Sequence, residues 1–211
     1  MSVGYDTDRT TYSNNLIYEG LYDPYGDGSD HNYATLVGDG ATRVALLGNV
    51  WSKVRNRVPR LKSDTTSVVA NNFAYFFDEA CSTDGSAETA WVGNKFTGTA
   101  ATGESIVEGS GTVYGEDNVT ADPQIDSDVD FVKTGTVGSK PLWPPGFSAM
   151  SSSRVEQHNL ANPARGRPIG PPTTSGSSGR SGTAPATTGS TPSTATGSRI
   201  PTRSAGTRTC R

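Results

Sequence analysis

One asparagine recurs at a nearly constant interval through the first 120 residues. It follows short runs rich in β-branched and aromatic residues, at Asn15, Asn49, Asn72, Asn94 and Asn118. The intervals are 34, 23, 22 and 24 residues, and a Gly- and Asp-rich insertion lies within the longest. A repeat of this length, in which β-rich runs alternate with turn residues, is typical of a β-solenoid. We therefore expect an all-β fold of stacked coils over residues 1–150.

The recurring asparagine has a structural interpretation. At a corner between strands, Asn tolerates the left-handed backbone region. Its side-chain amide can also bond to the same Asn in the coils above and below, which makes a ladder. We predict that these five asparagines form such a ladder and are not catalytic.

Composition excludes several classes of protein. No run in the 211 residues approaches the roughly 18 apolar residues of a membrane-spanning helix. The first residues have neither the basic start nor the apolar stretch of a signal peptide. Two cysteines, Cys81 and Cys210, are too few for a disulfide framework. A membrane protein, a small disulfide scaffold and a coiled coil are all excluded.

The chain changes character at about residue 151. Residues 1–150 carry 20 acidic and 10 basic side chains, whereas residues 151–211 carry one acid and eight arginines among Ser, Thr, Gly, Pro and Ala. Such a segment cannot bury enough apolar area to offset the entropy of ordering it. We predict a disordered tail over 151–211. Nucleic-acid binding through its arginines is the alternative, which the lack of interleaved aromatic residues disfavours.

Half of the basic residues of the acidic domain fall within ten positions. These are Lys53, Arg55, Arg57, Arg60 and Lys62, here called the basic segment. Pro59 fixes its own φ and holds Val58 extended, which sets how the flanking side chains project. A solvated turn is the ordinary interpretation. However, crowded cations repel one another, and an acidic protein keeps them most readily when an anion or a polyanion occupies the patch.

The sequence NVWSKVRNRVPRLKSDTTSVVANNFAYFF, residues 49–77, resembles the pectate lyases of polysaccharide lyase family 1. Their Arg-x-Pro-Arg-x-Arg motif reads Arg57-Val58-Pro59-Arg60-Leu61-Lys62 here, with Lys62 in place of the usual last Arg. Residues 12–44 are similar to the family's preceding coils and include its Leu-aliphatic-Gly step at 36–38. The resemblance covers about residues 5–150 and implies a right-handed parallel β-helix, as a partial solenoid.

The resemblance also implies a reaction. Pectate lyases cleave polygalacturonate by β-elimination, in which a base removes the C5 proton, the 4-O bond leaves, and Ca²⁺ helps to stabilise the developing charge. Arg57 matches the family's base, which requires surrounding cations to favour its neutral form. Arg60 and Lys62 match residues that bind substrate carboxylates. His31 resembles a substrate-side His of one branch of the family, although a surface position is its ordinary interpretation. Tyr33 stands where many members have Lys.

The family's Ca²⁺ carboxylates lie in coils before residue 12, so we expect this chain to correspond to the C-terminal part of a longer enzyme and to retain no assigned metal ligand. Asp23, Asp27 and Asp30 are candidates for Ca²⁺ binding or for an acidic surface. The same two interpretations apply to the second trio, Asp126, Asp128 and Asp130.

The resemblance implies a secreted monomer that binds acidic polysaccharide and neither nucleic acid nor a membrane. A non-catalytic β-solenoid that binds acidic polysaccharide is the alternative function. A nucleic-acid-binding protein is the third, and the net charge of −10 over residues 1–150 disfavours it.

Overall fold

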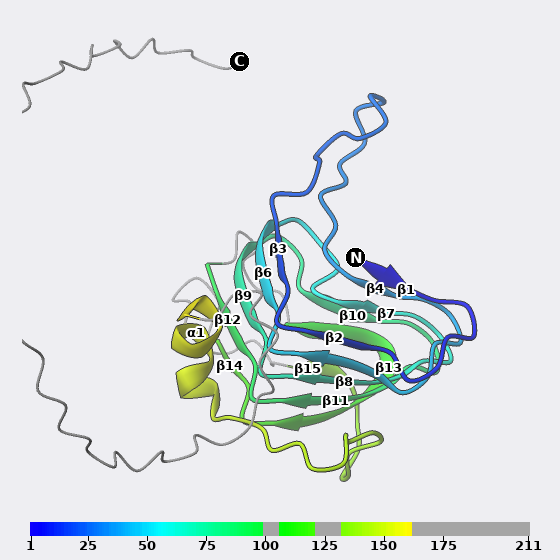
Figure 1. Ribbon diagram of the computed structural model, residues 1–211. Coiled ribbons are helices and arrows are strands. Elements are labelled where there is room, and N and C mark those ends of the chain that lie inside the picture. The colour runs from blue at the N-terminus through cyan, green and yellow to red at the C-terminus, as the bar shows by residue number, and fades with distance from the viewer. Residues whose placement is uncertain (99–105, 121–131, 162–211) are drawn as a thin grey trace, which may run out of the picture. The chain divides into compact units, whose positions relative to one another are not determined.

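The computed structural model describes residues 1–98, 106–120 and 132–161, which all lie in one compact unit. Its strands form three stacks of parallel strands (Figure 1). One stack contains β1 (Ser2–Val3), β4 (Leu36–Val37), β7 (Arg60–Leu61), β10 (Cys81–Thr83) and the first part of β13 (Val107–Glu116). The second contains β2 (Thr11–Ser13), β5 (Val44–Leu47), β8 (Thr66–Ala70), β11 (Glu88–Val92) and the rest of β13. The third contains β3 (Leu16–Tyr18), β6 (Val50–Val54), β9 (Phe73–Phe77), β12 (Lys95–Thr97) and β14 (Val119–Thr120).

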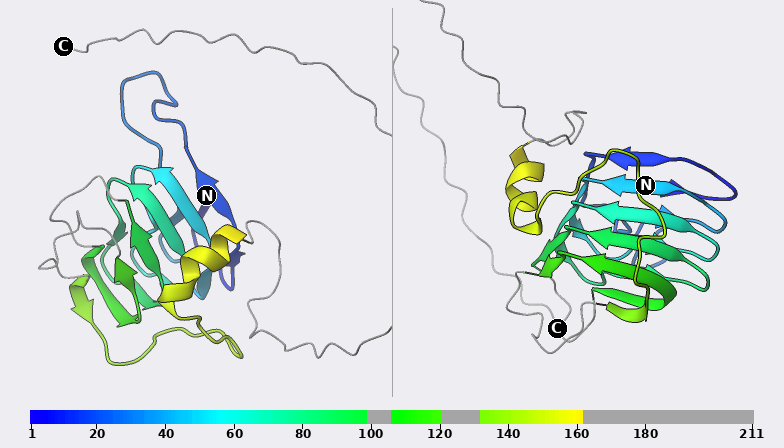
Figure 2. Two further views of the ribbon diagram at one scale, coloured as in Figure 1. Left: turned by 90° about the vertical axis from the view of Figure 1, so that its left-hand side faces the viewer. Right: turned by 90° about the horizontal axis from the view of Figure 1, so that it is seen from below.

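The chain visits the three stacks in turn, so that each coil lies on the one before it (Figure 2). Strands pair in parallel across coils, as with Val44–Leu47 on Ser67–Ala70. A further strand, β15 (Val132–Thr136), pairs in parallel with β13. The strands of one coil hydrogen-bond to strands of the next coil and not to one another. No coil can therefore satisfy its own backbone N–H and C=O groups alone. The predicted parallel β-helix is confirmed.

The core runs along the inside of the coils. Its largest buried side chains include Trp51, Trp91, Phe96, Leu46 and Leu61. The rings of Trp91 and Phe96 stack with centroids 5.7 Å apart, and Phe77 meets Phe96 edge-on at 5.8 Å. Aromatic pairs of this geometry add to the stabilisation that area burial gives. No helix in the described part of the chain is long and apolar enough to cross a membrane.

The five recurring asparagines form the predicted ladder. Each side-chain amide donates to the Oδ1 of the next Asn along the stack, at 2.9, 3.0, 3.0 and 2.8 Å from Asn15 to Asn118. Each of these Oδ1 atoms also accepts the backbone N–H of the Asn before it, over distances of 2.8–3.1 Å. Asn49, Asn72 and Asn94 are buried, so the ladder satisfies polar groups that water does not reach.

The conformational part of the ladder prediction needs correction. The left-handed residue at each corner is the one before the ladder Asn. These five residues are Asn14, Gly48, Asn71, Gly93 and Asp117. Their φ values lie between 49° and 65°. They are Gly, Asn or Asp because these residues enter the left-handed region most readily.

One helix, α1 (Ser152–Ala161), lies against β9 and β12, as Figure 2 shows. Val155 packs there with Val50 and Phe73. The prediction that a disordered tail starts at residue 151 is therefore corrected, because residues 152–161 form this helix. Their apolar residues follow only a weak helical pattern, so the helix was not predicted. The rest of that predicted tail, residues 162–211, lies outside the described residues, as do Asp126, Asp128 and Asp130.

Candidate functional site

The basic segment crosses from the third stack to the first. It leaves β6 at Val54 and enters β7 at Arg60. Val58 and Pro59 are both buried, so this dipeptide anchors the turn in the core. Arg57 and Arg60, on either side, are half-buried. The anchored turn thus presents its flanking cations at the surface of the coil.

Four of the five cations in this segment pair with carboxylates from neighbouring coils. Lys53 lies 2.7 Å from Glu19, and Arg60 lies 2.8 Å from Asp84. The Nζ atom of Lys62 lies 3.4 Å from Asp39. Arg55 pairs with both Asp30 and Asp78. The repulsion expected from the sequence is therefore largely cancelled by acids contributed from other coils.

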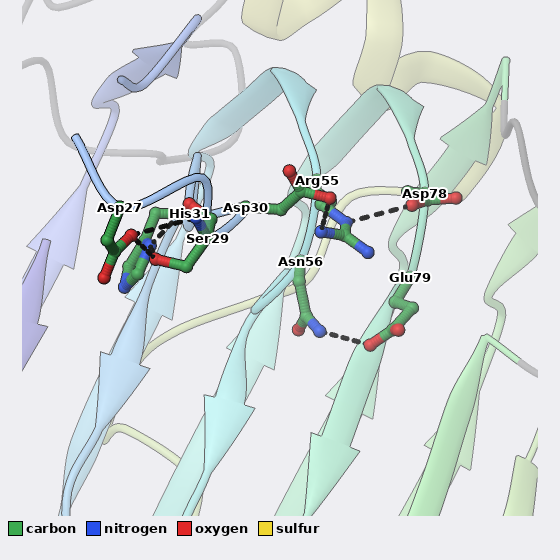
Figure 3. Close-up of polar contacts among 8 residues, drawn as sticks. All are labelled: Asp27, Ser29, Asp30, His31, Arg55, Asn56, Asp78 and Glu79. Carbon is green, nitrogen blue, oxygen red and sulfur yellow. Dashed lines mark hydrogen bonds and ion pairs between the residues drawn. The ribbon is translucent and has the colours of Figure 1, made fainter. Parts of the chain in front are cut away.

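Arg55 lies between Asp30 and Asp78 (Figure 3). Its Nη1 is 2.5 Å from Asp30 and its Nε is 3.2 Å from Asp78. Desolvation opposes its charge, but the hydrogen bond to Asp78 and the charges of both acids raise the pKa of Arg55. The hydrogen bond to Glu19 likewise raises the pKa of Lys53. Both side chains are thus held as cations.

Arg57 is the one residue of the basic segment, all of which the structure describes, without a carboxylate at ion-pair distance. Its guanidinium carbon lies 4.1 Å from the ring centroid of Tyr33, a cation–π contact that stabilises the charge. Its backbone is left-handed, with φ of 64°, and its carbonyl accepts the N–H of Thr35 at 2.8 Å. Asn56 beside it donates to Glu79 (Figure 3).

His31 and Arg57 lie at the two ends of a contact through Tyr33. The rings of His31 and Tyr33 have centroids 5.0 Å apart, and Tyr25 meets His31 edge-on at 4.8 Å. Nδ1 of His31 lies 3.2 Å from both the hydroxyl and the carbonyl oxygen of Ser29 (Figure 3). The structure thus groups His31 with Arg57. Arg60 begins the next strand, β7, and Lys62 directly follows its end. Both charges already face carboxylates.

The described residues do not fit Ca²⁺. Within them, no group of three or more His, Cys, Asp or Glu side chains is arranged to hold a metal ion. Asp23 accepts the backbone N–H groups of Asp27 and Gly28, Asp27 accepts from Ser29, and Asp30 pairs with Arg55. These three carboxylates therefore stabilise their own loop and its attachment to the coil.

A pocket lies beside the basic segment, and sequence reasoning missed it. Its volume is about 460 Å³, and its lining includes Lys53 and Arg55 but none of the four predicted site residues. It was missed because its walls come from positions far apart in sequence. The repeat interval was the available signal: Arg55 and Asp78, which both line it, are 23 residues apart, one coil of the ladder.

Comparison with known proteins supports the fold alone. No family model matches the sequence, and no curated protein matches it. Among solved structures, a thermostable pectate lyase matches with a TM-score of 0.57 and 18% sequence identity. The match covers 76% of this chain and 42% of that one. The chain thus shares a parallel β-helix with a pectate lyase and spans less than half of that structure.

Proposed function

We propose that the protein is a polysaccharide lyase of the pectate-lyase type, acting on galacturonate polymers at the face that carries Arg57. The observation that carries this proposal is the state of Arg57, which is half-buried and the one cation of the described basic segment that no carboxylate neutralises. The charge of Arg57 is therefore available to pair with the carboxylate of a uronate. The shared fold with a pectate lyase supports the same assignment.

In the proposed reaction, Arg57 first gives a proton to solvent and then takes the C5 proton of a galacturonate unit. The electrons of the C5–H bond form the C4=C5 double bond, and the C4–O bond to the next sugar breaks. The leaving oxygen then takes a proton from solvent. Arg60 and Lys62 meet neighbouring carboxylates, and to do so they exchange the contacts with Asp84 and Asp39 for contacts with substrate. His31 lies on the same side through Tyr33.

No step of this proposal passes through Ca²⁺, because the described carboxylates do not fit it. That observation favours a second candidate function, in which the same face binds acidic polysaccharide without cleaving it. This second function predicts that the protein is retained on immobilised polygalacturonate, that added salt weakens the retention, and that no unsaturated product forms.

The test is release of unsaturated uronides from polygalacturonate, followed by ultraviolet absorbance, with and without added Ca²⁺. Arg57→Ala is expected to lower the rate by about 10²–10⁴-fold, the usual contribution of a general base. Arg9→Ala is the matched control, since Arg9 has the same left-handed backbone with φ of 58°. Full activity in Arg57→Ala would remove Arg57 as the base. Binding without product in the unmodified protein would leave the second function.

The proposed setting follows from the substrate. The pectate lyases that the sequence resembles act on galacturonate polymers outside the cell. We therefore propose that this protein acts outside the cell, as a monomer with an acidic polysaccharide as its partner.

A further inference from the structure

The pocket beside the basic segment is built on a backbone feature that recurs from coil to coil. Lys53 and Phe76 both have left-handed φ values, of 51° and 54°, inside β6 and β9. They occupy equivalent positions, because the paired residues on either side are Ser52 with Tyr75 and Val54 with Phe77. Left-handed backbone is uncommon for residues other than Gly, and residues held in it are frequent at binding sites.

The same left-handed position recurs in both neighbouring coils. Glu19, whose φ is 45°, precedes Lys53 in the stack, and Gly98, at 72°, follows Phe76. Lys53 and Phe76 are both exposed, Phe76 to 53%. Glu19, Lys53 and Phe76 all line the pocket.

The charge of the pocket is unsuited to an anion. Glu19, Asp30 and Asp78 supply three carboxylates, against the two cations Lys53 and Arg55. Both cations are already engaged, Lys53 with Glu19 and Arg55 with both aspartates. A uronate placed here would meet more negative than positive charge, and it would have to displace an existing ion pair.

The remaining surface of the pocket suits a neutral sugar. Tyr22 and Phe76 line it and are 60% and 53% exposed, so their rings offer apolar faces to the C–H face of a pyranose. Asp30 and Asp78 supply carboxylate oxygens, which accept hydrogen bonds from hydroxyls. The volume of about 460 Å³ falls in the range of about 300–1,000 Å³ usual for small-molecule sites.

We propose that this pocket binds a neutral hexopyranose unit beside the face that carries Arg57. Arg55 links the two, since it lines the pocket and lies two residues before Arg57. The inference deepens the proposed function: it makes the substrate a polysaccharide in which neutral sugars accompany the uronates. The sugar site itself stands on the pocket alone and does not require catalysis.

The test compares binding of two trisaccharides that differ only at C6, 1,4-linked trigalactose and trigalacturonate, by ligand-observed NMR at millimolar concentrations. The unmodified full chain is expected to bind trigalactose. Phe76→Ala is expected to weaken that binding by about tenfold, because it removes an aromatic face. Tyr75→Ala is the matched control: Tyr75 is an exposed neighbour on the same strand outside the pocket lining, and its loss should leave trigalactose binding unchanged.

Two further variants separate the sugar site from the lyase. Asp78→Asn removes one negative charge from the lining, and it is expected to raise the affinity for trigalacturonate relative to trigalactose by about three- to fivefold. Arg57→Ala removes the proposed base and should leave trigalactose binding unchanged. If trigalactose binds but no unsaturated uronide is released, the result counts against the proposed lyase function and not against the sugar site. Absence of trigalactose binding, or equal effects of Phe76→Ala and Tyr75→Ala, would overturn the sugar site.

Discussion

At the scale of single residues, each ladder asparagine makes several hydrogen bonds at once. Asn72 accepts from the backbone and side-chain N–H groups of Asn49 at 2.8 and 3.0 Å, and its own amide donates to Leu46, Ala70 and Asn94. All of these bonds are buried. Loss of such a side chain leaves several polar groups without partners, which costs more than the net value of one hydrogen bond.

We therefore predict that Asn72→Ala lowers the free energy of unfolding by about 2–4 kcal/mol. Asn15→Ala is the matched control, because Asn15 ends the described ladder and is only half-buried. Its loss should cost about 1 kcal/mol. Urea denaturation followed by tryptophan fluorescence measures both values. Equal costs for the two variants would show that burial does not set the value of the ladder.

The ladder could be predicted from the sequence because its residue type repeats at a fixed interval. The ion pairs were not predicted, although the same interval contained them. Arg55 and Asp78 are 23 residues apart, and Arg60 and Asp84 are 24 apart. Extending the period from the asparagines to the charges would have paired these residues. The contact of Arg57 with Tyr33 has the same period, since these two residues are 24 apart.

At the scale of elements, α1 depends on one carboxylate from the coils. Asp117 accepts from the backbone N–H of Ser152 at 2.9 Å and from its hydroxyl at 2.8 Å, which caps the start of the helix. The hydrogen bond from the Ser152 backbone lowers the pKa of Asp117. The sequence could not show this cap, since its two partners are 35 residues apart.

This cap makes the docking of α1 sensitive to acid. A carboxylate whose pKa is lowered by folding stabilises the folded state above its ordinary pKa, and that stabilisation is lost as the pH falls through the lower, folded value. We predict that amide-exchange protection of residues 152–161 falls as the pH drops below about 4. Asp117→Asn should have weaker protection at neutral pH and a flatter response to acid. An unchanged acid response in that variant would exclude Asp117 as the cause.

The buried and exposed faces of β9 and β12 have different roles. Replacing a Phe by Ala on each face should distinguish these roles. Phe96 is fully buried between Trp91 and Phe77, whereas Phe76 is 53% exposed. We predict that Phe96→Ala lowers the free energy of unfolding by about 3–5 kcal/mol and Phe76→Ala by less than about 1 kcal/mol. Thermal and denaturant unfolding measure both. A large loss in Phe76→Ala would mean that this side chain serves packing and not a ligand.

At the scale of the whole molecule, the repeat determines what the sequence could predict. Stacked coils, a shared core and an Asn ladder all follow from one period, so the parallel β-helix was predictable. Helix α1 and residues 142–149 before it are not part of the repeat. There, Trp143 and Phe147 pack against the cluster that contains Ala45 and Val68, on the outer face of the second stack. Nothing in the local composition indicates this docking.

The proposed catalytic role of Arg57 toward a uronate polymer is tested by the rate of unsaturated uronide release from polygalacturonate. The rate is compared for the unmodified chain, Arg57→Ala and Arg9→Ala, with matched melting curves for all three. We predict measurable release that Arg57→Ala lowers by about 10²–10⁴-fold and Arg9→Ala retains, at equal stability. Equal release by the unmodified chain and Arg57→Ala would exclude Arg57 as the catalytic side chain.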